Sequence, residues 1–223
     1  MKLTILNKLT VGAQYNKFKL QENRVFDDEI NCVVEYFLRL IKNRKWKSPY
    51  QIISISLGEN KNEWEGDFFQ LERVFDFRKF YENDLRSRKK IILDIICDLF
   101  LEISKKYNLG KEIILNIKEE ISSSDYKNYW YFKEKLFRSP DHKLYAGIWF
   151  EWGEDILSAY LHLFEKDKKS IIIQDKLFDI PTYEGENMYY LKPKWLDSNT
   201  FLFNNENQKI TYSKKVGPIS VVN

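Results

Sequence analysis

The feature that most constrains this chain is a change of residue pattern near residue 125. Before it, isoleucine and leucine recur every three or four residues over 84–107 and over 111–121, which is the spacing of one apolar helix face. After it, aromatic and aliphatic residues alternate with polar ones in short runs separated by turns. That second pattern is typical of an antiparallel meander rather than of βαβ units. Two packed helices are therefore expected to divide the chain.

The first half is predicted to mix helices and strands. Asp84 can cap the first central helix, and 108–110 supplies its stop. Earlier in the chain, Ile and Leu alternate with Ser over 53–57, which is the period of a half-buried strand. The remaining expected elements are a short strand at 3–5, a polar connector at 16–23, a helix at 27–45 that Asp27 or Asp28 caps, and one bent or two short strands at 64–77.

The second half is predicted to be nearly all β. Alternate apolar residues fill one face of a long strand at 144–152, and 153–155 turns the chain into a returning strand. Further strands are expected at 129–137, 156–164, 170–178, 200–203 and 209–212. The predicted fold class is α+β, with an N-terminal mixed α/β part, two central helices and a C-terminal antiparallel β-meander that forms an open sheet or small sandwich. We expect one compact domain over 1–223, with possible sub-structure 1–125 and 126–223.

Composition excludes several classes of protein. With 223 residues, of which 43% are hydrophobic, the chain can bury a sizeable core, and 8 Gly and 5 Pro exclude collagen-like and low-complexity classes. The formal net charge of +3 is too small for the long-range field that nucleic-acid binding uses. No apolar run approaches a membrane span, and residues 1–9 offer no continuous hydrophobic region of the kind that a signal peptide has. We expect a cytoplasmic protein with no membrane or nucleic-acid partner, in which Cys32 and Cys97 are buried free thiols.

Motifs for catalysis are scarce. The chain contains neither G-x-G-x-x-G nor G-x-x-x-x-G-K, so the kinase and dehydrogenase classes have no sequence support. Its two histidines, His142 in a predicted turn and His162 on a predicted strand, have neither triad partners nor metal-ligand spacing. We predict a protein that is not an enzyme, with no catalytic residue, no metal and no cofactor.

The densest group of carboxylates lies between residues 59 and 67. At strand period Glu63, Glu65 and Asp67 share one face, where they could bind a hard cation or meet a basic partner. The plainer interpretation is the solvated face of a hairpin whose other face is aromatic. The sequence Glu59-Asn60-Lys61 is similar to the acidic-x-Lys element of metal-dependent nucleases, but it falls in a predicted turn. These carboxylates support the alternative function, a metal-dependent hydrolase or nuclease.

The aromatic strands of the second half offer a candidate binding surface. Trp149 falls on the strand face opposite Phe150 and Trp152. Tryptophan supplies a large contact area, and carboxylates set partner choice and association rate. The candidate partner-binding residues are Trp149, Glu151, Trp152, Glu154 and Asp155, together with the acidic group Glu63, Glu65 and Asp67.

The stretch from about 74 to 203 also carries a resemblance. Its helix over 86–107, the turn Ser139-Pro140-Asp141 and the segment Trp195-Leu196-Asp197 resemble uncharacterised bacterial proteins that look like immunity proteins of polymorphic toxin systems. The resemblance implies stoichiometric binding of a cognate toxin domain, with no catalytic residues in this chain. An accessory domain of a larger assembly is a third interpretation, and the sequence leaves the oligomeric state open.

Overall fold

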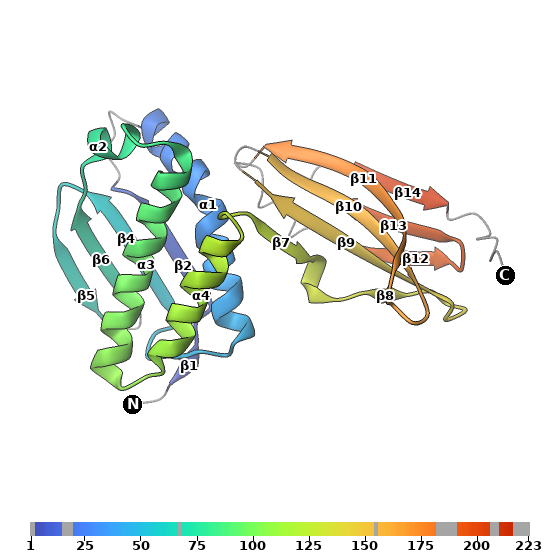
Figure 1. The fold of residues 1–223 in the computed structure, drawn as a ribbon, viewed down its shortest axis with the longest axis horizontal. Coiled ribbons are helices and arrows are strands. Elements are labelled where there is room, and N and C mark those ends of the chain that lie inside the picture. Colours follow the sequence, from blue (N-terminus) through green and yellow to red (C-terminus); the bar gives the residue numbers. More distant parts are fainter. Residues whose placement is uncertain are drawn as a thin grey trace. The chain divides into compact units, whose positions relative to one another are not determined.

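The computed structural model describes residues 3–14, 20–66, 68–153, 156–181, 191–205 and 210–215, with the backbone alone at 20–24, 205 and 210–215 (Figure 1). The chain divides into two compact units, Met1–Asn128 (unit 1) and Tyr129–Asn223 (unit 2). This division lies close to the change of pattern near residue 125. The predicted α+β class is confirmed, whereas a single domain over the whole chain stays a prediction.

Unit 1 is a sheet covered on one face by helices (Figure 1). Its strand order is β2 (Lys8–Ala13), β4 (Ile52–Gly58), β6 (Phe69–Val74) and β5 (Asn62–Glu65), with β2, β4 and β6 parallel and β5 antiparallel at one edge. Helix α1 (Leu20–Asn43) connects β2 to β4, as a parallel pair requires. The other helices are α2 (Phe77–Tyr81), α3 (Leu85–Tyr107) and α4 (Lys111–Ser123), and β1 (Thr4–Ile5) pairs with β3 (Lys47–Ser48).

The core of unit 1 follows from the two periods in its sequence. In β4, Ile53, Ile55 and Leu57 are buried while the serines between them are only half-buried. The predicted stripe of α3 is buried in the same hydrophobic cluster, at Ile92, Ile96, Leu99 and Ile103. The helix ends are also as predicted. The side chain of Asp84 accepts a hydrogen bond from the Ser87 amide at 2.8 Å, and Asn108 ends α3 with a left-handed backbone, φ 53°.

The start of unit 1 differs from the prediction. Residues 20–23, expected in a connector, form the first turn of α1, and a strand that was not predicted, β2, precedes it. Asp27 therefore lies inside the helix instead of capping it. Its Oδ1 accepts a hydrogen bond from the Ala13 amide at 3.2 Å, and burial raises its pKa to about 6. The end of the expected strand at 64–77 also differs, because Asp76 caps the short helix α2 by accepting from the Lys79 amide.

Unit 2 is a small sandwich of two sheets (Figure 1). The first has the order β11 (Ile171–Pro181), β10 (Ile156–Glu165), β9 (Leu144–Trp152) and β7 (Asn128–Tyr131), with β8 (Phe137–Arg138) also paired to β9. The second consists of β12 (Lys194–Asp197), β13 (Thr200–Asn205) and β14 (Ile210–Lys215). Aromatic contacts join the two sheets, with ring centroids 5.9 Å apart for Phe178 and Phe203 and 6.1 Å apart for Phe137 and Phe201.

Two strand predictions in unit 2 need correction. The strand expected at 129–137 is interrupted by the short 3₁₀ turn η1 (Phe132–Glu134), because Lys133 and Glu134 adopt positive φ angles that no strand can continue through. The segment Trp195-Leu196-Asp197 lies in β12, a strand that was not predicted. The indole N–H of Trp195 donates to the carbonyl oxygen of Phe137 at 2.9 Å and so fixes β12 beside β8.

No helix in the described ranges combines the length and the apolar composition that crossing a membrane requires.

The core assignment of α3 predicts unequal effects of two alanine substitutions. Ile96→Ala should lower the free energy of unfolding by about 2–4 kcal/mol, because the buried side chain leaves a cavity. Lys90→Ala should cost much less, since its ion pair with Asp94 at 2.6 Å is on the exposed helix face. Chemical denaturation of both variants measures the difference, and equal small losses would contradict the core position of Ile96.

Candidate binding surface

Strand β9 sends its side chains alternately to two different environments. Its even-numbered residues face the interior of the sandwich, where Ile148 and Phe150 are fully buried. Trp152 belongs to this set. It is 3% exposed, and its ring centroid lies 6.2 Å from that of Trp130. The structure therefore places Trp152 in the core of unit 2, because it has the parity of Phe150, and its side chain is not on the surface where the sequence analysis expected a partner.

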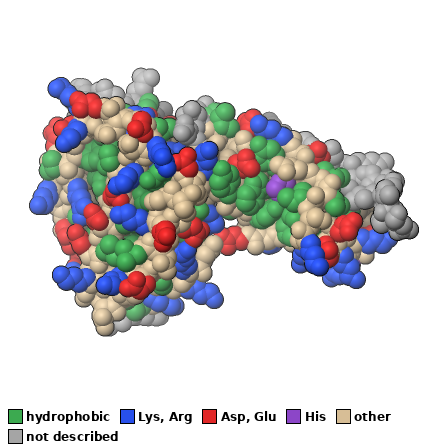
Figure 2. Space-filling model, in the orientation of Figure 1, with side chains coloured by type: hydrophobic (Ala, Val, Ile, Leu, Met, Phe, Trp, Pro, Cys, Tyr) green, Lys and Arg blue, Asp and Glu red, His purple; other side chains and the backbone are tan. Residues whose placement is uncertain are grey.

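The other face of the same sheet is covered with rings, and we call it the aromatic face. It consists of Tyr129, Tyr131, Tyr145, Trp149, Tyr160, His162 and Phe164. The register of β9 and β10 pairs Trp149 with Tyr160 and places His162 opposite Gly147. Figure 2 shows hydrophobic side chains gathered over this sheet. Most of these rings are half-buried, whereas Tyr129 is exposed and His162 and Phe164 are buried.

Trp149 is the centre of the aromatic face. Its ring centroid lies 4.8 Å from Tyr131, 5.9 Å from His162 and 6.0 Å from Tyr129. The planes of Trp149 and Tyr129 differ by only 9°. Its indole N–H donates to Oε1 of Glu151 at 3.1 Å. Trp149 and Glu151, both predicted as partner-binding residues, are thus adjacent and half-buried on one face, while Glu154 and Asp155 lie outside the described residues.

Gly147 allows Tyr131 to reach across the sheet. A Cβ atom at this position would lie 2.8 Å from the Tyr131 ring and 2.6 Å from Leu136, so any side chain here would displace both. Because the position is open, the Tyr131 hydroxyl comes within 2.8 Å of Nδ1 of His162. No sequence motif indicates this pair, and only the alternation of His162 with Leu161 and Leu163 indicates which face of the sheet the histidine takes.

His162 is a buried titratable group. It is 4% exposed, and its Nε2 atom has no hydrogen-bond partner within the described part of the chain. Burial lowers its pKa, and the nearby charge of Glu151 opposes this effect. The folded protein therefore favours the neutral imidazole.

The predicted acidic group of unit 1 is placed differently. Glu63 and Glu65 lie on one face of β5, opposite Leu71 and Phe69 of β6, as the strand period predicts. Asp67 lies outside the described residues. Within the described ranges, no group of three or more His, Cys, Asp or Glu side chains is arranged to hold a metal ion.

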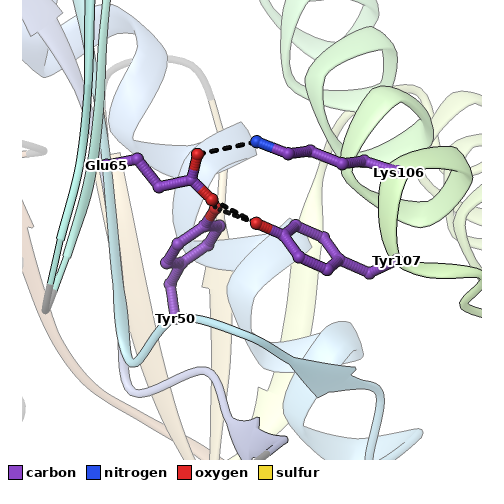
Figure 3. Close-up of polar contacts among 4 residues, drawn as sticks. All are labelled: Tyr50, Glu65, Lys106 and Tyr107. Atoms are coloured by element: carbon purple, nitrogen blue, oxygen red, sulfur yellow. Dashed lines mark hydrogen bonds and ion pairs between the residues drawn. The ribbon is translucent and has the colours of Figure 1, made fainter. Parts of the chain in front are cut away.

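Glu65 is engaged by three donors, and we call Tyr50, Glu65, Lys106 and Tyr107 the Glu65 cluster. Figure 3 shows Lys106 and Tyr107 extending from the end of α3 toward the carboxylate. The Lys106 ammonium lies 2.6 Å from Oε2, and the hydroxyls of Tyr107 and Tyr50 donate to Oε1. The hydrogen bond from Lys106 has the largest effect, and together with the two from the tyrosines it lowers the pKa of Glu65 to about 2. A carboxylate held ionised in this way is a poor proton acceptor, and its role is to fix the edge strand β5 to α3.

Comparisons of this chain with protein-family models, with curated proteins and with solved structures find no match. Function is therefore inferred from the geometry of the chain itself.

Replacement of Glu65 tests its structural role. Glu65→Gln should lower the free energy of unfolding at pH 7 by about 1 kcal/mol, a modest value because the cluster is partly exposed. The folded pKa is depressed, so the stabilisation is present above about pH 4.5 and is lost as the pH falls toward 2. Chemical denaturation at pH 7 and pH 3 should show that the difference in the free energy of unfolding between variant and parent is smaller at pH 3. Glu63→Gln, at an exposed position of the same strand, is the matched control. It should leave the free energy of unfolding unchanged at both pH values.

Acidification should destabilise unit 2 through His162. Above about pH 6.5 the histidine is neutral in both the folded and unfolded chain, and below it the unfolded chain takes up a proton that the folded state disfavours. The denaturation midpoint should therefore decrease between pH 6.5 and 5. This decrease should be smaller in His162→Gln, while His142→Gln, in an exposed turn, should retain it. If the denaturation midpoint of His162→Gln decreased with pH as much as that of the parent, His162 would not be the source of the pH dependence.

Proposed function

We propose that this chain is a non-catalytic binding protein that neutralises a cognate toxin domain by stoichiometric binding, as an immunity protein does. The observation that supports the proposal is the aromatic face of unit 2, where Trp149 and Glu151 lie together on a hydrogen-bonded sheet. Tryptophan and tyrosine are enriched among the residues that dominate binding energy at protein interfaces, and a carboxylate beside them sets partner choice and association rate. The resemblance of residues 74–203 to immunity-like bacterial proteins favours a toxin as the partner.

The support beneath this face suits it to binding. The opposite side of the sheet carries buried residues such as Phe150, and Phe178 of β11 contacts Phe203 of β13 with ring centroids 5.9 Å apart, so the sheet is held by its own core. The rings above it are fixed by contacts with one another and by the Tyr131–His162 hydrogen bond. Large rings that are already ordered lose little conformational entropy when a partner covers them. A preorganised surface of this kind supports tight association without any chemical step.

Co-expression with the product of the neighbouring gene tests the proposal. The pair should form a complex on size-exclusion chromatography, and this chain should protect the host cell from the partner's toxicity. If there is neither a complex nor protection, the immunity function is wrong.

Replacement of Trp149 tests the proposed surface. Trp149→Ala should weaken the complex by about 2 kcal/mol, roughly thirtyfold in Kd, because a central aromatic contact is lost. Trp64→Ala removes a 47% exposed tryptophan from β5 in unit 1 and is the control that should leave Kd unchanged. Circular dichroism must show that Trp149→Ala folds. If it does not, Glu151→Lys provides the same test and should slow association most at low salt.

A further inference from the structure

The charges at the Glu151 end of the aromatic face are not balanced. Glu151, Ser158 and Asp179 form one row across β9, β10 and β11, since Ser158 is paired with Glu151 on one side and with Asp179 on the other. The nearby Lys176 is directed to Asp179, with Nζ and Oδ2 2.8 Å apart. Lys176 thus forms its ion pair with Asp179, and among the described residues no cation forms an ion pair with Glu151.

Glu151 retains unused acceptor capacity. A carboxylate can accept about four hydrogen bonds, and the hydrogen bond found for Glu151 is the one from the Trp149 indole at 3.1 Å. The side chain is half-buried beside the Trp149 ring, where a charge without an ion pair is costly. The surface therefore complements a positive group from outside the chain.

We propose that the partner places an arginine side chain on the aromatic face, with its guanidinium paired to Glu151 beside Trp149. This inference rests on the proposed function and names the chemistry of the partner at the same surface. Arginine fits better than lysine, because its planar guanidinium can donate to both carboxylate oxygens and is weakly hydrated beside aromatic rings. Unit 2 already places its own cations against rings of this face, with Lys168 Nζ 4.1 Å from the centroid of Tyr145.

The proposal can be tested with the full chain and simple probes. In ¹⁵N-labelled protein, the indole N–H signal of Trp149 is assigned by its loss in Trp149→Phe, and hexa-arginine peptide is titrated at low salt. The signal should shift saturably, because the indole donates to the carboxylate that the arginine binds. A hexaglutamate peptide and a ten-nucleotide thymidine oligonucleotide should leave it in place. No shift with hexa-arginine, or a shift with the oligonucleotide instead, would overturn the proposal.

Two variants at the row of carboxylates sharpen the result. Glu151→Gln keeps the acceptor for the indole but removes the charge, and it should weaken peptide binding roughly tenfold. Asp179→Asn frees Lys176, whose charge already interacts with Glu151, and the competing lysine should also weaken binding. Glu165→Gln makes the same charge change at an exposed position at the other end of β10 and should have less than about a twofold effect. Equal affinity of the parent and Glu151→Gln would overturn the proposal.

The outcomes also separate this inference from the proposed function. If hexa-arginine binds at Trp149 but the neighbouring gene product is neither bound nor neutralised, the immunity function fails and the arginine site stands. If the complex forms and its Kd is unchanged by Glu151→Gln, the arginine site is wrong and the binding function stands.

Discussion

The two-residue period of β9 is the constraint on which the architecture of unit 2 depends. It directs Ile148, Phe150 and Trp152 into the sandwich and Trp149 and Glu151 to the opposite face. A shift of register by one residue would bury the Glu151 carboxylate and expose Phe150, so hydrophobic burial opposes slippage strongly. Gly147 adds a second restraint, since the Tyr131 ring occupies the space that a side chain would need. The alternation of side chains along β9 thus produces both the core of unit 2 and the candidate binding surface.

The parts of the fold that could be predicted from the sequence are those set by local periodicity and by caps. The stripe of α3, its Asp84 cap and its stop at Asn108 are all formed by residues near one another in the chain. The start of α1 could not be predicted in this way. Asp27 is a good capping residue, but its carboxylate bonds instead to the amide of Ala13 on β2. That contact exists only once the strand has packed against the helix.

The candidate site shows the same division between local and distant information. The parity of β9 already indicated that Trp149 and Trp152 point to opposite faces, so the core position of Trp152 follows from the sequence pattern itself. The Tyr131–His162 hydrogen bond joins residues 31 positions apart, and Lys106 meets Glu65 across 41 positions. No periodicity specifies which distant side chains become partners, because strand order and helix packing decide it.

Glu65 and Glu151 show how the surroundings of a carboxylate decide its role. Both are glutamates on strands beside aromatic residues, and from the sequence both were candidates for partner binding. Glu65 receives donors from α3 and from Tyr50, so a partner would have to displace bonds already made within unit 1. In the described part of the chain, Glu151 accepts a hydrogen bond from the Trp149 indole, and the nearby Lys176 is paired with Asp179. A new cation at Glu151 would therefore gain an electrostatic interaction without breaking one. A cation from a partner gains the most electrostatic energy at a carboxylate that has no ion pair within its own chain. The surface around Glu151 in unit 2 is therefore more favourable for a positively charged partner than the surface around Glu65.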